Sequence, residues 1–347
     1  MPIPPDRLDA ILKEFGLSGA SLVPLGSGLI NVTFGVDAAD GRRLVLQRVN
    51  PIFPPEVNRD IDVLTRHLSE VGMVTPSIVP TRSGALWLES QGEVWRLMTH
   101  VAGVCPEALD GATQAEEAGR LLAEFHRAVG DLDHEFANPR LGVHDTARHL
   151  RILERALSEH LGHARFSAIE PLAREILEAA GTLPELPTLP DRVVHGDPKI
   201  NNIIFDEQSG RALCLVDLDT IGRMPLSLEL GDAFRSWCNP AGEDIADGQF
   251  SADLFEPALR GYAAGAAGWI EEHEWRAILP ATHTILIELA ARFCADALNE
   301  NYFGWDPERF ATRSEHNHVR AAGQLAAARS LQRQEKRLQD IIERCRV

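Results

Sequence analysis

The stretch from Val193 to Asp219 constrains this chain more than any other. It reads VVHGDPKINNIIFDEQSGRALCLVDLD. A short polar loop comes first, two apolar runs follow, and a further acid, Asp217, stands after the second run. The loop holds four side chains that can do chemistry: His195, Asp197, Lys199 and Asn202. Polar groups that flank buried strands need partners or a purpose, because burying them alone costs free energy. We therefore expect the functional site here.

The two apolar runs predict a β-hairpin. Residues 203–205 and 212–216 are rich in β-branched, aromatic and other apolar side chains, and the residues between them have turn chemistry. If the hairpin folds about residues 209–210, antiparallel pairing places Asn202 opposite Asp217. Mg²⁺ takes a few oxygen ligands of this kind and completes its shell with water and phosphate oxygens. The hairpin therefore predicts Asn202 and Asp217 as metal ligands.

The same spacing is the one that phosphoryl transfer uses. One Asp orients the attacking hydroxyl, an Asn five residues later binds metal, and a separate Asp binds metal on the nucleotide phosphates. Asp197 and Asn202 have this spacing, so Asp197 is the predicted catalytic base. Lys199 could reach the transferring phosphate as a point charge. The pattern HGDxxxxN, followed by an acid after a strand, resembles the aminoglycoside phosphotransferase and choline kinase branch of the protein-kinase-like fold.

Composition excludes several classes of protein. The chain has 347 residues and a formal net charge of −17, the wrong sign for a nucleic-acid partner. Its five cysteines form no CxxC pair, which indicates reduced thiols and a cytoplasmic protein. The first residues lack a signal-peptide pattern, and there is no run of 18 apolar residues, so we expect no membrane partner.

The N-terminal third predicts a nucleotide-binding lobe. Gly28 and Asn31 lie in a glycine-bearing turn before a β-branched run, and such turns can lie against phosphates. In the next strand, the register of a kinase places Gln47 where the phosphate-binding lysine would be, and Arg48 points the other way. We expect Arg48 to reach over, or Gln47 and Lys199 to suffice.

A helix over residues 55–71 follows, and its Glu56 or Asp60 could pair with Arg48. The strand over residues 93–101 would then end at a hinge between two lobes. Adenine would bind backbone groups near Met98 to His100, although a lone histidine such as His100 is more often a surface or structural residue.

The rest of the chain predicts helices. Asp232 is expected to support the catalytic loop from below, with Arg235 as its partner. Asp219 is expected to contact a metal ligand, to contact the substrate or to cap a helix. In a long helix, Glu288, Arg292 and Asp296 are spaced by four and share one face. They would form a polar wall of an acceptor site or, alternatively, a surface charge ladder.

A longer resemblance narrows the function. The blocks GLINVTF, LVLQRVN, HGDPKINNIIFDEQSGRALCLVDLDT, LGDAFR, RFCADALNENYF and NHVRAAGQ, from about residue 26 to 325, resemble bacterial N-acetylhexosamine 1-kinases. The resemblance implies transfer of the ATP γ-phosphate to the anomeric hydroxyl of N-acetylglucosamine or N-acetylgalactosamine, with Mg²⁺. It implies that Asp197 is the base, Asn202 and Asp217 are the metal ligands, and Lys199 contacts phosphate or sugar. It also implies that three residues of the C-terminal block lie near the acceptor: Arg292, Asp296 and Tyr302.

We therefore expect an α+β, bilobal, protein-kinase-like fold, with a β-rich lobe over residues 1–101 and a helical lobe over 102–347. The chain would be a sugar kinase that uses ATP and Mg²⁺, as a monomer or homodimer. Three alternatives remain open. They are a kinase of another small molecule such as an aminoglycoside, homoserine or choline, a catalytically impaired nucleotide-binding protein, and a metallohydrolase built on His195, Asp197, Asp217 and Asp219.

Overall fold

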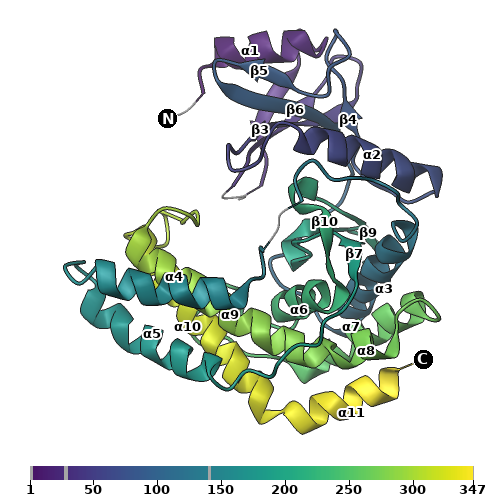
Figure 1. Cartoon of the computed structure of the whole chain (residues 1–347). Coiled ribbons are helices and arrows are strands. Elements are labelled where there is room, and N and C mark those ends of the chain that lie inside the picture. Colours follow the sequence, from purple (N-terminus) through teal and green to yellow (C-terminus); the bar gives the residue numbers. More distant parts are fainter. Residues whose placement is uncertain (1–2, 27–29, 140–141, 347) are drawn as a thin grey trace.

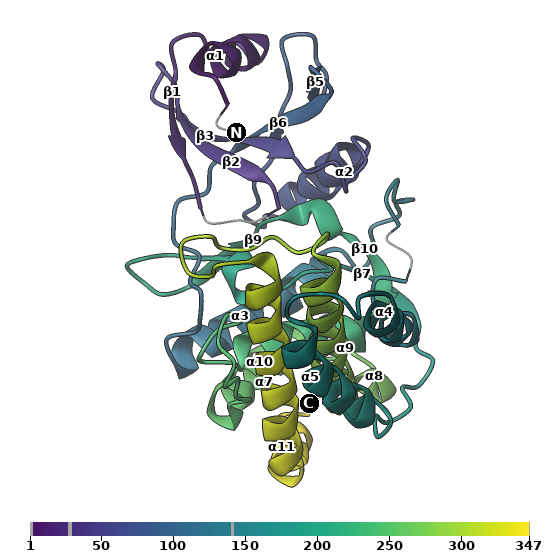
Figure 2. The same cartoon turned by 90° about the vertical axis from the view of Figure 1, so that its left-hand side faces the viewer.

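An antiparallel sheet forms the N-terminal part of the computed structural model, which describes residues 3–26, 30–139 and 142–346 (Figure 1). Its strand order is β1-β2-β3-β6-β4, and β5 also pairs with β6. These strands are β1 (Ser21–Pro24), β2 (Val32–Asp37), β3 (Arg43–Val49), β4 (Ile78–Val79), β5 (Leu88–Ser90) and β6 (Glu93–Thr99). Helix α1 (Pro5–Glu14) covers one edge of the sheet, and α2 (Val57–Glu70) runs between the sheet and the helical part (Figures 1 and 2).

The C-terminal part is mostly helical and carries two small two-stranded sheets, β10-β7 and β8-β9. Its strands are β7 (Asp191–Val194), β8 (Ile203–Phe205), β9 (Ala212–Leu215) and β10 (Gly222–Pro225). Its helices are α3 (Ala112–Ala128), α4 (Thr146–Glu159), α5 (Phe166–Ala180), α6 (Leu226–Trp237), α7 (Ala252–Ala266), α8 (Glu272–Arg276), α9 (Ile278–Asn299), α10 (Arg313–Arg333) and α11 (Glu335–Cys345). Two 3₁₀ turns, η1 (Ile200–Asn202) and η2 (Leu218–Thr220), flank the β8-β9 hairpin.

Two apolar cores hold these parts together. The smaller core lies between α1 and the sheet and includes Leu12, Leu46 and Trp95. The larger core begins on α2, at residues such as Ile61, and continues through the helices below. Burial of α2 in the larger core explains its strong apolar stripe. It also ties the sheet-bearing part to the helical part at the level of the site.

The expected α+β kinase-like architecture is confirmed. The helix predicted over residues 55–71 is present but begins at Val57, after two prolines. The chain passes from the sheet into the helical part just after β6 ends at Thr99, and the division at residue 101 stays a prediction.

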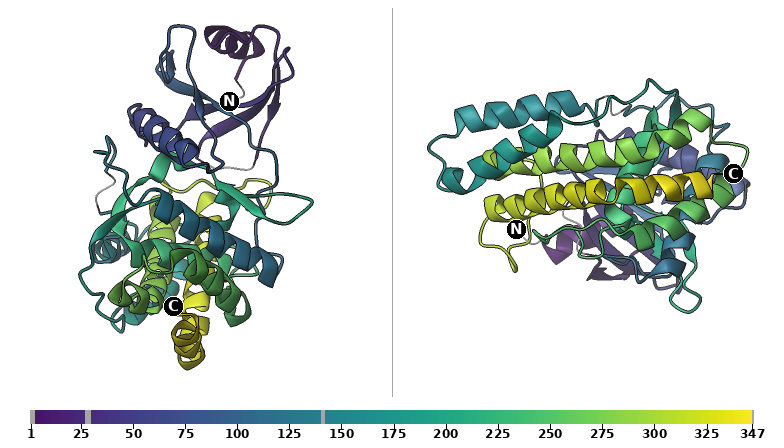
Figure 3. Two further views of the ribbon diagram at one scale, coloured as in Figure 1. Left: turned by 90° about the vertical axis from the view of Figure 1, so that its right-hand side faces the viewer. Right: turned by 90° about the horizontal axis from the view of Figure 1, so that it is seen from below.

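Helix α9 is the central helix of the helical part. It lies beside α10 and is flanked by α4 and α5 (Figure 3). By length and composition α9 could cross a membrane, yet 89% of its most apolar window is buried inside the fold. A buried window of this kind is what a core helix of a globular protein has.

Candidate active site

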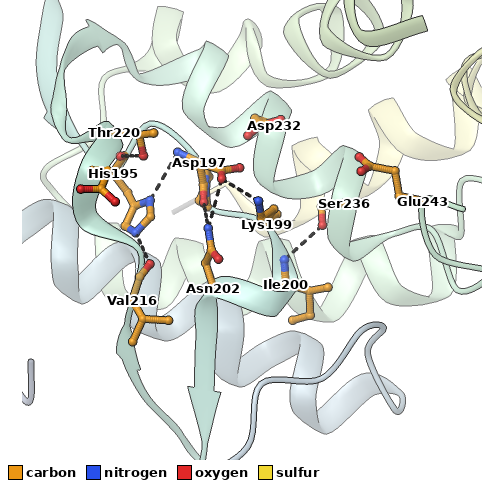
Figure 4. Close-up of polar contacts among 12 residues, drawn as sticks. His195, Asp197, Lys199, Ile200, Asn202, Val216, Thr220, Asp232, Ser236 and Glu243 are labelled. Atoms are coloured by element: carbon orange, nitrogen blue, oxygen red, sulfur yellow. Dashed lines mark hydrogen bonds and ion pairs between the residues drawn. The ribbon is translucent and has the colours of Figure 1, made fainter. Parts of the chain in front are cut away.

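The loop after β7 brings the predicted catalytic residues together (Figure 4). Lys199 Nζ lies 2.8 Å from Asp197 Oδ2, and both side chains are about a quarter exposed, at 27% and 21%. The Asn202 Nδ2 amide donates to the Asp197 backbone carbonyl at 2.8 Å and to Asp197 Oδ2 at 3.2 Å. Asp197, Lys199 and Asn202 therefore form one half-buried polar group at the mouth of the β8-β9 hairpin.

The charges of this group depend on one another. Burial alone would raise the pKa of Asp197, but Lys199 and Arg235 outweigh it and lower that pKa to about 2. Burial likewise disfavours the charged form of Lys199, but Asp197 and Asp217 raise its pKa above the ordinary value. Asp197 is therefore a carboxylate across the physiological range and a ready hydrogen-bond acceptor.

A buried glutamate on α6 holds the loop backbone. Glu229 accepts from the backbone N–H of His195 and of Gly196, each at 2.9 Å. Gly196 has a φ of +81°, and a Cβ there would lie 2.2 Å from the Thr220 carbonyl oxygen, so only glycine fits. Asp232 pairs with Arg235 at 2.8 Å, as predicted, but no hydrogen bond joins Asp232 to this loop in the described part of the chain. The support comes from Glu229 instead.

His195 is a structural residue. It is fully buried, its Nε2 donates to the Val216 carbonyl at 2.9 Å, and its Nδ1 accepts from the Asp197 backbone N–H at 3.3 Å. Burial lowers the pKa of His195, so the ring is neutral. Both ring nitrogens are therefore engaged within the protein, which removes the histidine ligand that the metallohydrolase alternative needs.

The hairpin differs from its predicted register by one residue. Ile203 pairs with Leu215, and a bulge lies between Ile204 and Phe205. Asn202 consequently faces Val216, whose N–H donates to the Asn202 carbonyl at 2.9 Å. Asp217 comes one residue later, in the left-handed conformation with a φ of 63°. That conformation is uncommon for a residue other than glycine, although Asp tolerates it better than most.

Asp217 still belongs to the site. Burial and the neighbouring Asp219 raise the pKa of Asp217 to about 7, while Lys199 opposes that rise. A carboxylate in this setting is one that a bound cation would stabilise. Within the described residues, both hydrogen bonds of the Asn202 side chain use Nδ2, which leaves Oδ1 as its possible metal-binding oxygen.

The donor set fits Mg²⁺ bound together with a nucleotide. No group of three or more His, Cys, Asp or Glu side chains in the described part of the chain could hold a metal by itself. One carboxylate and one amide oxygen are the few protein ligands that Mg²⁺ takes when phosphates and waters supply the rest. Asn202 and Asp217 are the residues that would hold it.

The two candidate phosphate anchors on β3 face other partners. Arg48 Nη1 lies 2.9 Å from Glu93 Oε1, and the Gln47 side-chain oxygen accepts from Arg96 Nε at 2.8 Å. Arg48 therefore does not reach over, and the predicted pairing with Glu56 or Asp60 is not formed. Asp60 instead accepts from His134 and from the backbone of residues 137 and 138, in the loop that leads toward α4.

Asp219 has a role that the sequence did not predict. Its carboxylate is fully buried and bonds both terminal nitrogens of Arg96, one of them at 2.7 Å. The same carboxylate accepts from Asn31 Nδ2 at 2.7 Å. Asp219 is therefore inaccessible to an acceptor molecule. Asn31 lies just before β2, whereas Gly28 lies outside the described residues.

The predicted hinge follows β6. Met98 is buried and pairs with Val45 and Ile78, while His100 is half-buried. Burial and the nearby Arg43 lower the pKa of His100, so it is neutral at pH 7. After the hinge, Val104 exchanges backbone hydrogen bonds with Phe205 of β8 at 2.8–2.9 Å. Adenine binding near Met98 and His100 stays a prediction.

A cavity of about 440 Å³ lies between α4, α9 and the loops on either side. The three predicted acceptor residues, Arg292, Asp296 and Tyr302, all line it. Arg292 lies 5.6 Å above the Phe303 ring and 3.7 Å from the buried Glu288. Arg292 and Asp296 therefore line a cavity, whereas Glu288 is buried behind it and accepts from His144 and Thr146 at 2.9 and 2.7 Å. That the cavity is an acceptor site stays a prediction.

Asp296 is fully engaged within the protein. Its Oδ1 accepts from the backbone N–H of Asn301 and Tyr302 at 3.0 and 2.9 Å. Its Oδ2 accepts from Phe303 N at 2.8 Å and from Asn317 Nδ2 at 2.9 Å. Asp296 thus shapes the turn that carries Tyr302 and Phe303 into the cavity.

Comparisons with known proteins agree with this fold. A profile described as the phosphotransferase enzyme family matches residues 21–268. An aminoglycoside phosphotransferase from Alicyclobacillus acidocaldarius is similar in structure, with 18% identity, a TM-score of 0.59, and coverage of 99% of this chain and 96% of that one. A microcompartment-associated aminopropanol kinase has 16% identity, a TM-score of 0.62 and coverage of 95% and 98%. An amicoumacin kinase bound to AMP-PNP and Ca²⁺ has 12% identity, a TM-score of 0.58 and coverage of 98% and 96%.

Proposed function

The chain belongs to the phosphotransferase enzyme family, whose members are small-molecule kinases that use ATP with a divalent metal, and from that premise we propose that it phosphorylates an N-acetylhexosamine. The acceptor atom would be the anomeric hydroxyl of N-acetylglucosamine or N-acetylgalactosamine. The resemblance of the sequence blocks to N-acetylhexosamine 1-kinases motivates this choice, and the lining of the cavity supports it.

The catalytic group can perform the transfer with little covalent chemistry. Asp197 would accept the hydrogen bond of the sugar hydroxyl, orient it for in-line attack, and take its proton late in the reaction. Lys199, now paired with Asp197, would turn toward the transferring phosphate. Magnesium held by Asn202 and Asp217 would supply charge neutralisation on the phosphates. Most of the rate would come from positioning and electrostatics.

The choice of a neutral acceptor rests on the charges that line the cavity. Asp296 is the one acid among the described lining residues, and four donors already occupy its carboxylate. Two arginines, Arg148 and Arg292, also line the cavity. A cationic acceptor needs free carboxylates or an aromatic cage without cations close by. The lining therefore favours a neutral, hydrogen-bonding acceptor over an amine such as those named for two of the similar structures.

The remaining lining suits a sugar. Asn138, Asn299 and Asn301 offer amide groups that both donate and accept hydrogen bonds, as hydroxyls require. Tyr302 and Phe303 offer ring surface for the apolar face of a sugar or for an acetyl methyl group. A volume near 440 Å³ lies within the usual range of about 300–1,000 Å³ for small-molecule pockets.

A panel of acceptors tests the proposal. ADP formation would be measured with MgATP and, in turn, N-acetylglucosamine, N-acetylgalactosamine, glucose, an aminoglycoside, choline, ethanolamine and homoserine. We expect the highest kcat/KM with an N-acetylhexosamine, and acceptor-dependent ADP formation by the Asp197→Asn variant that is slower by on the order of 10²–10⁴. Preference for any amine-bearing acceptor would overturn the proposal, and equal phosphate release without acceptor would indicate an ATPase.

A further inference from the structure

Gln47 stands where a kinase-like fold has its strand lysine, and a charged residue, Arg96, lies beside it on the neighbouring strand. In the sheet, Gln47 of β3 pairs directly with Arg96 of β6. Arg96 Nε donates to the Gln47 side-chain oxygen at 2.8 Å, and the terminal nitrogens of Arg96 bond both oxygens of Asp219. Arg96 is 1% exposed and Asp219 is not exposed at all. The pair is thus a two-pronged ion pair sealed between the sheet and the helical part.

Burial removes the hydration of both charges, and this costs free energy. The cost argues that the pair has a role beyond stability. Two desolvated charges are stabilised only when geometry is good and the remaining polar atoms are satisfied, and an apolar pair of similar volume would often be as stable. Here Asn31 Nδ2 supplies a further bond to Asp219, and the Asn31 oxygen accepts from the Asn50 backbone N–H at 2.8 Å. Asp219 therefore joins β6 to Asn31, the residue just before β2.

The same carboxylate lies two residues after Asp217. The turn η2 follows Asp217 and contains Asp219. It is tied to the catalytic loop, because Thr220 Oγ1 donates to the His195 carbonyl at 2.9 Å. Asp217 itself has a φ of 63°, and the surrounding structure has to hold such a conformation in place. Arg96, by fixing Asp219, fixes one side of the segment that presents Asp217.

We propose that the Arg96–Asp219 pair is the positioning element of the metal site, and that it takes over from the missing strand lysine by aligning Asp217 rather than by touching phosphate. Arg96 is too deeply buried to contact a nucleotide. It acts by joining β6, Asn31 just before β2, and η2, the turn that follows Asp217, and it thereby holds Asp217 in place. The inference rests on the proposed kinase function but is independent of the acceptor.

The test separates positioning from stability by removing the charges together. The single variant Arg96→Met leaves a buried carboxylate alone and should unfold at a lower temperature. The double variant R96M/D219N leaves no buried charge and keeps an oxygen for Asn31, so its melting temperature should recover toward wild type. Its affinity for a non-hydrolysable ATP analogue in the presence of Mg²⁺ should nevertheless fall by about 10- to 100-fold, the usual effect of losing a supporting residue behind a metal ligand. Affinity without Mg²⁺ should change little.

A second bidentate ion pair provides the control. Arg192 of β7, which is 23% exposed, bonds both oxygens of the buried Glu274 of α8 at 2.6 and 2.8 Å. The variant R192M/E274Q should bind the Mg²⁺–nucleotide analogue as wild type does. If R96M/D219N does not fold, Arg96→Lys preserves the charge but not the two-pronged contact, and it should fold and show the same selective loss.

The outcomes are distinct. A folded R96M/D219N or Arg96→Lys variant that binds the Mg²⁺–nucleotide analogue like wild type overturns the positioning role. A loss of affinity that is equal with and without Mg²⁺ also overturns it. Failure of the wild-type protein to bind the Mg²⁺–nucleotide analogue would instead overturn the proposed kinase function.

Discussion

Lys199 Nζ lies 2.8 Å from Oδ2 of Asp197, so the predicted base and the predicted phosphate-binding cation form an ion pair with each other. The pair lowers the pKa of Asp197 against the opposing effect of burial. A carboxylate with so low a pKa orients a hydroxyl by hydrogen bonding and takes its proton only when the oxygen has begun to bond to phosphorus. The arriving phosphate would compete with Asp197 for Lys199 and free the carboxylate for the acceptor.

The variant Asp197→Asn is expected to lose catalysis and keep its fold. The amide is isosteric, but it cannot accept the hydroxyl proton, so kcat should fall by on the order of 10²–10⁴. Nucleotide affinity, measured by titration calorimetry, should stay within about threefold of wild type, because Asp197 is not a predicted metal ligand. A turnover close to wild type with an active acceptor would remove Asp197 from the mechanism.

The variant Glu229→Ala is expected to destabilise the protein. It leaves the buried N–H groups of His195 and Gly196 without acceptors, and each such group costs about 1–3 kcal/mol. The free energy of unfolding in urea should drop by at least about 2 kcal/mol. Glu124→Ala, which removes a half-exposed surface ion pair on α3, should change it by less than about 0.5 kcal/mol. Equal stability of the two variants would show that Glu229 does not support the catalytic loop.

The variant Tyr302→Ala is expected to weaken acceptor binding selectively. Tyr302 lines the proposed acceptor cavity and lies near Arg292, with its side chain half exposed. Losing the ring surface should raise the acceptor KM about 10-fold, which corresponds to about 1.4 kcal/mol, and should leave kcat and the KM for ATP close to wild type. Tyr302→Phe keeps the ring and should behave like wild type. A rise in the KM for ATP instead would place the acceptor elsewhere.

The free energy of unfolding at acid pH should depend on Asp244. Burial alone would raise the pKa of Asp244, but His316 and Arg320, each donating at 2.8 Å, lower it from its ordinary value of 3.8. A lowered pKa in the folded state means that the stabilisation is present above the unfolded value, near pH 3.8, and is lost as the pH falls toward the folded value.

Unfolding of wild type and Asp244→Asn from pH 6 to pH 2 would check this expectation. The wild-type advantage should be about 1.5–3 kcal/mol above pH 5 and should shrink below pH 4. Asp253→Asn, which alters an 84% exposed partner of Arg337, serves as the control and should show no such dependence. A constant difference across the whole range would contradict the assignment.

The sequence predicted what depends on short spacing. The loop that joins Asp197, Lys199 and Asn202 spans six residues, and local geometry alone brings them together. The kinase-like fold followed from the same stretch and from the strands and helices on either side. The hairpin register was wrong by one residue because the turn closes earlier than predicted, with the Asp206 N–H bonded to the Arg211 carbonyl at 2.9 Å. This turn shifts the pairing by two residues, and the bulge between Ile204 and Phe205 recovers one of them.

Contacts between segments that are distant in the sequence could not be predicted from it. Arg96 and Asp219 are 123 residues apart, and Glu229 lies 34 residues from the loop it supports. A signal was nevertheless present, since Arg96 is the one charged residue between Val94 and Met98 in an otherwise apolar strand. A buried-strand pattern with a single charge predicts a buried partner. The identity of that partner depends on how the lobes pack.

The most direct test of the account is the Mg²⁺ dependence of ATP binding in wild type and in Asp217→Ala, measured by titration calorimetry at pH 8. Asn202 and Asp217 are the proposed metal ligands, so Mg²⁺ should tighten ATP binding to wild type by about 10-fold or more and should have little effect on the variant. Equal enhancement by Mg²⁺ in both proteins would contradict the claim that this loop and hairpin hold a metal-bound nucleotide.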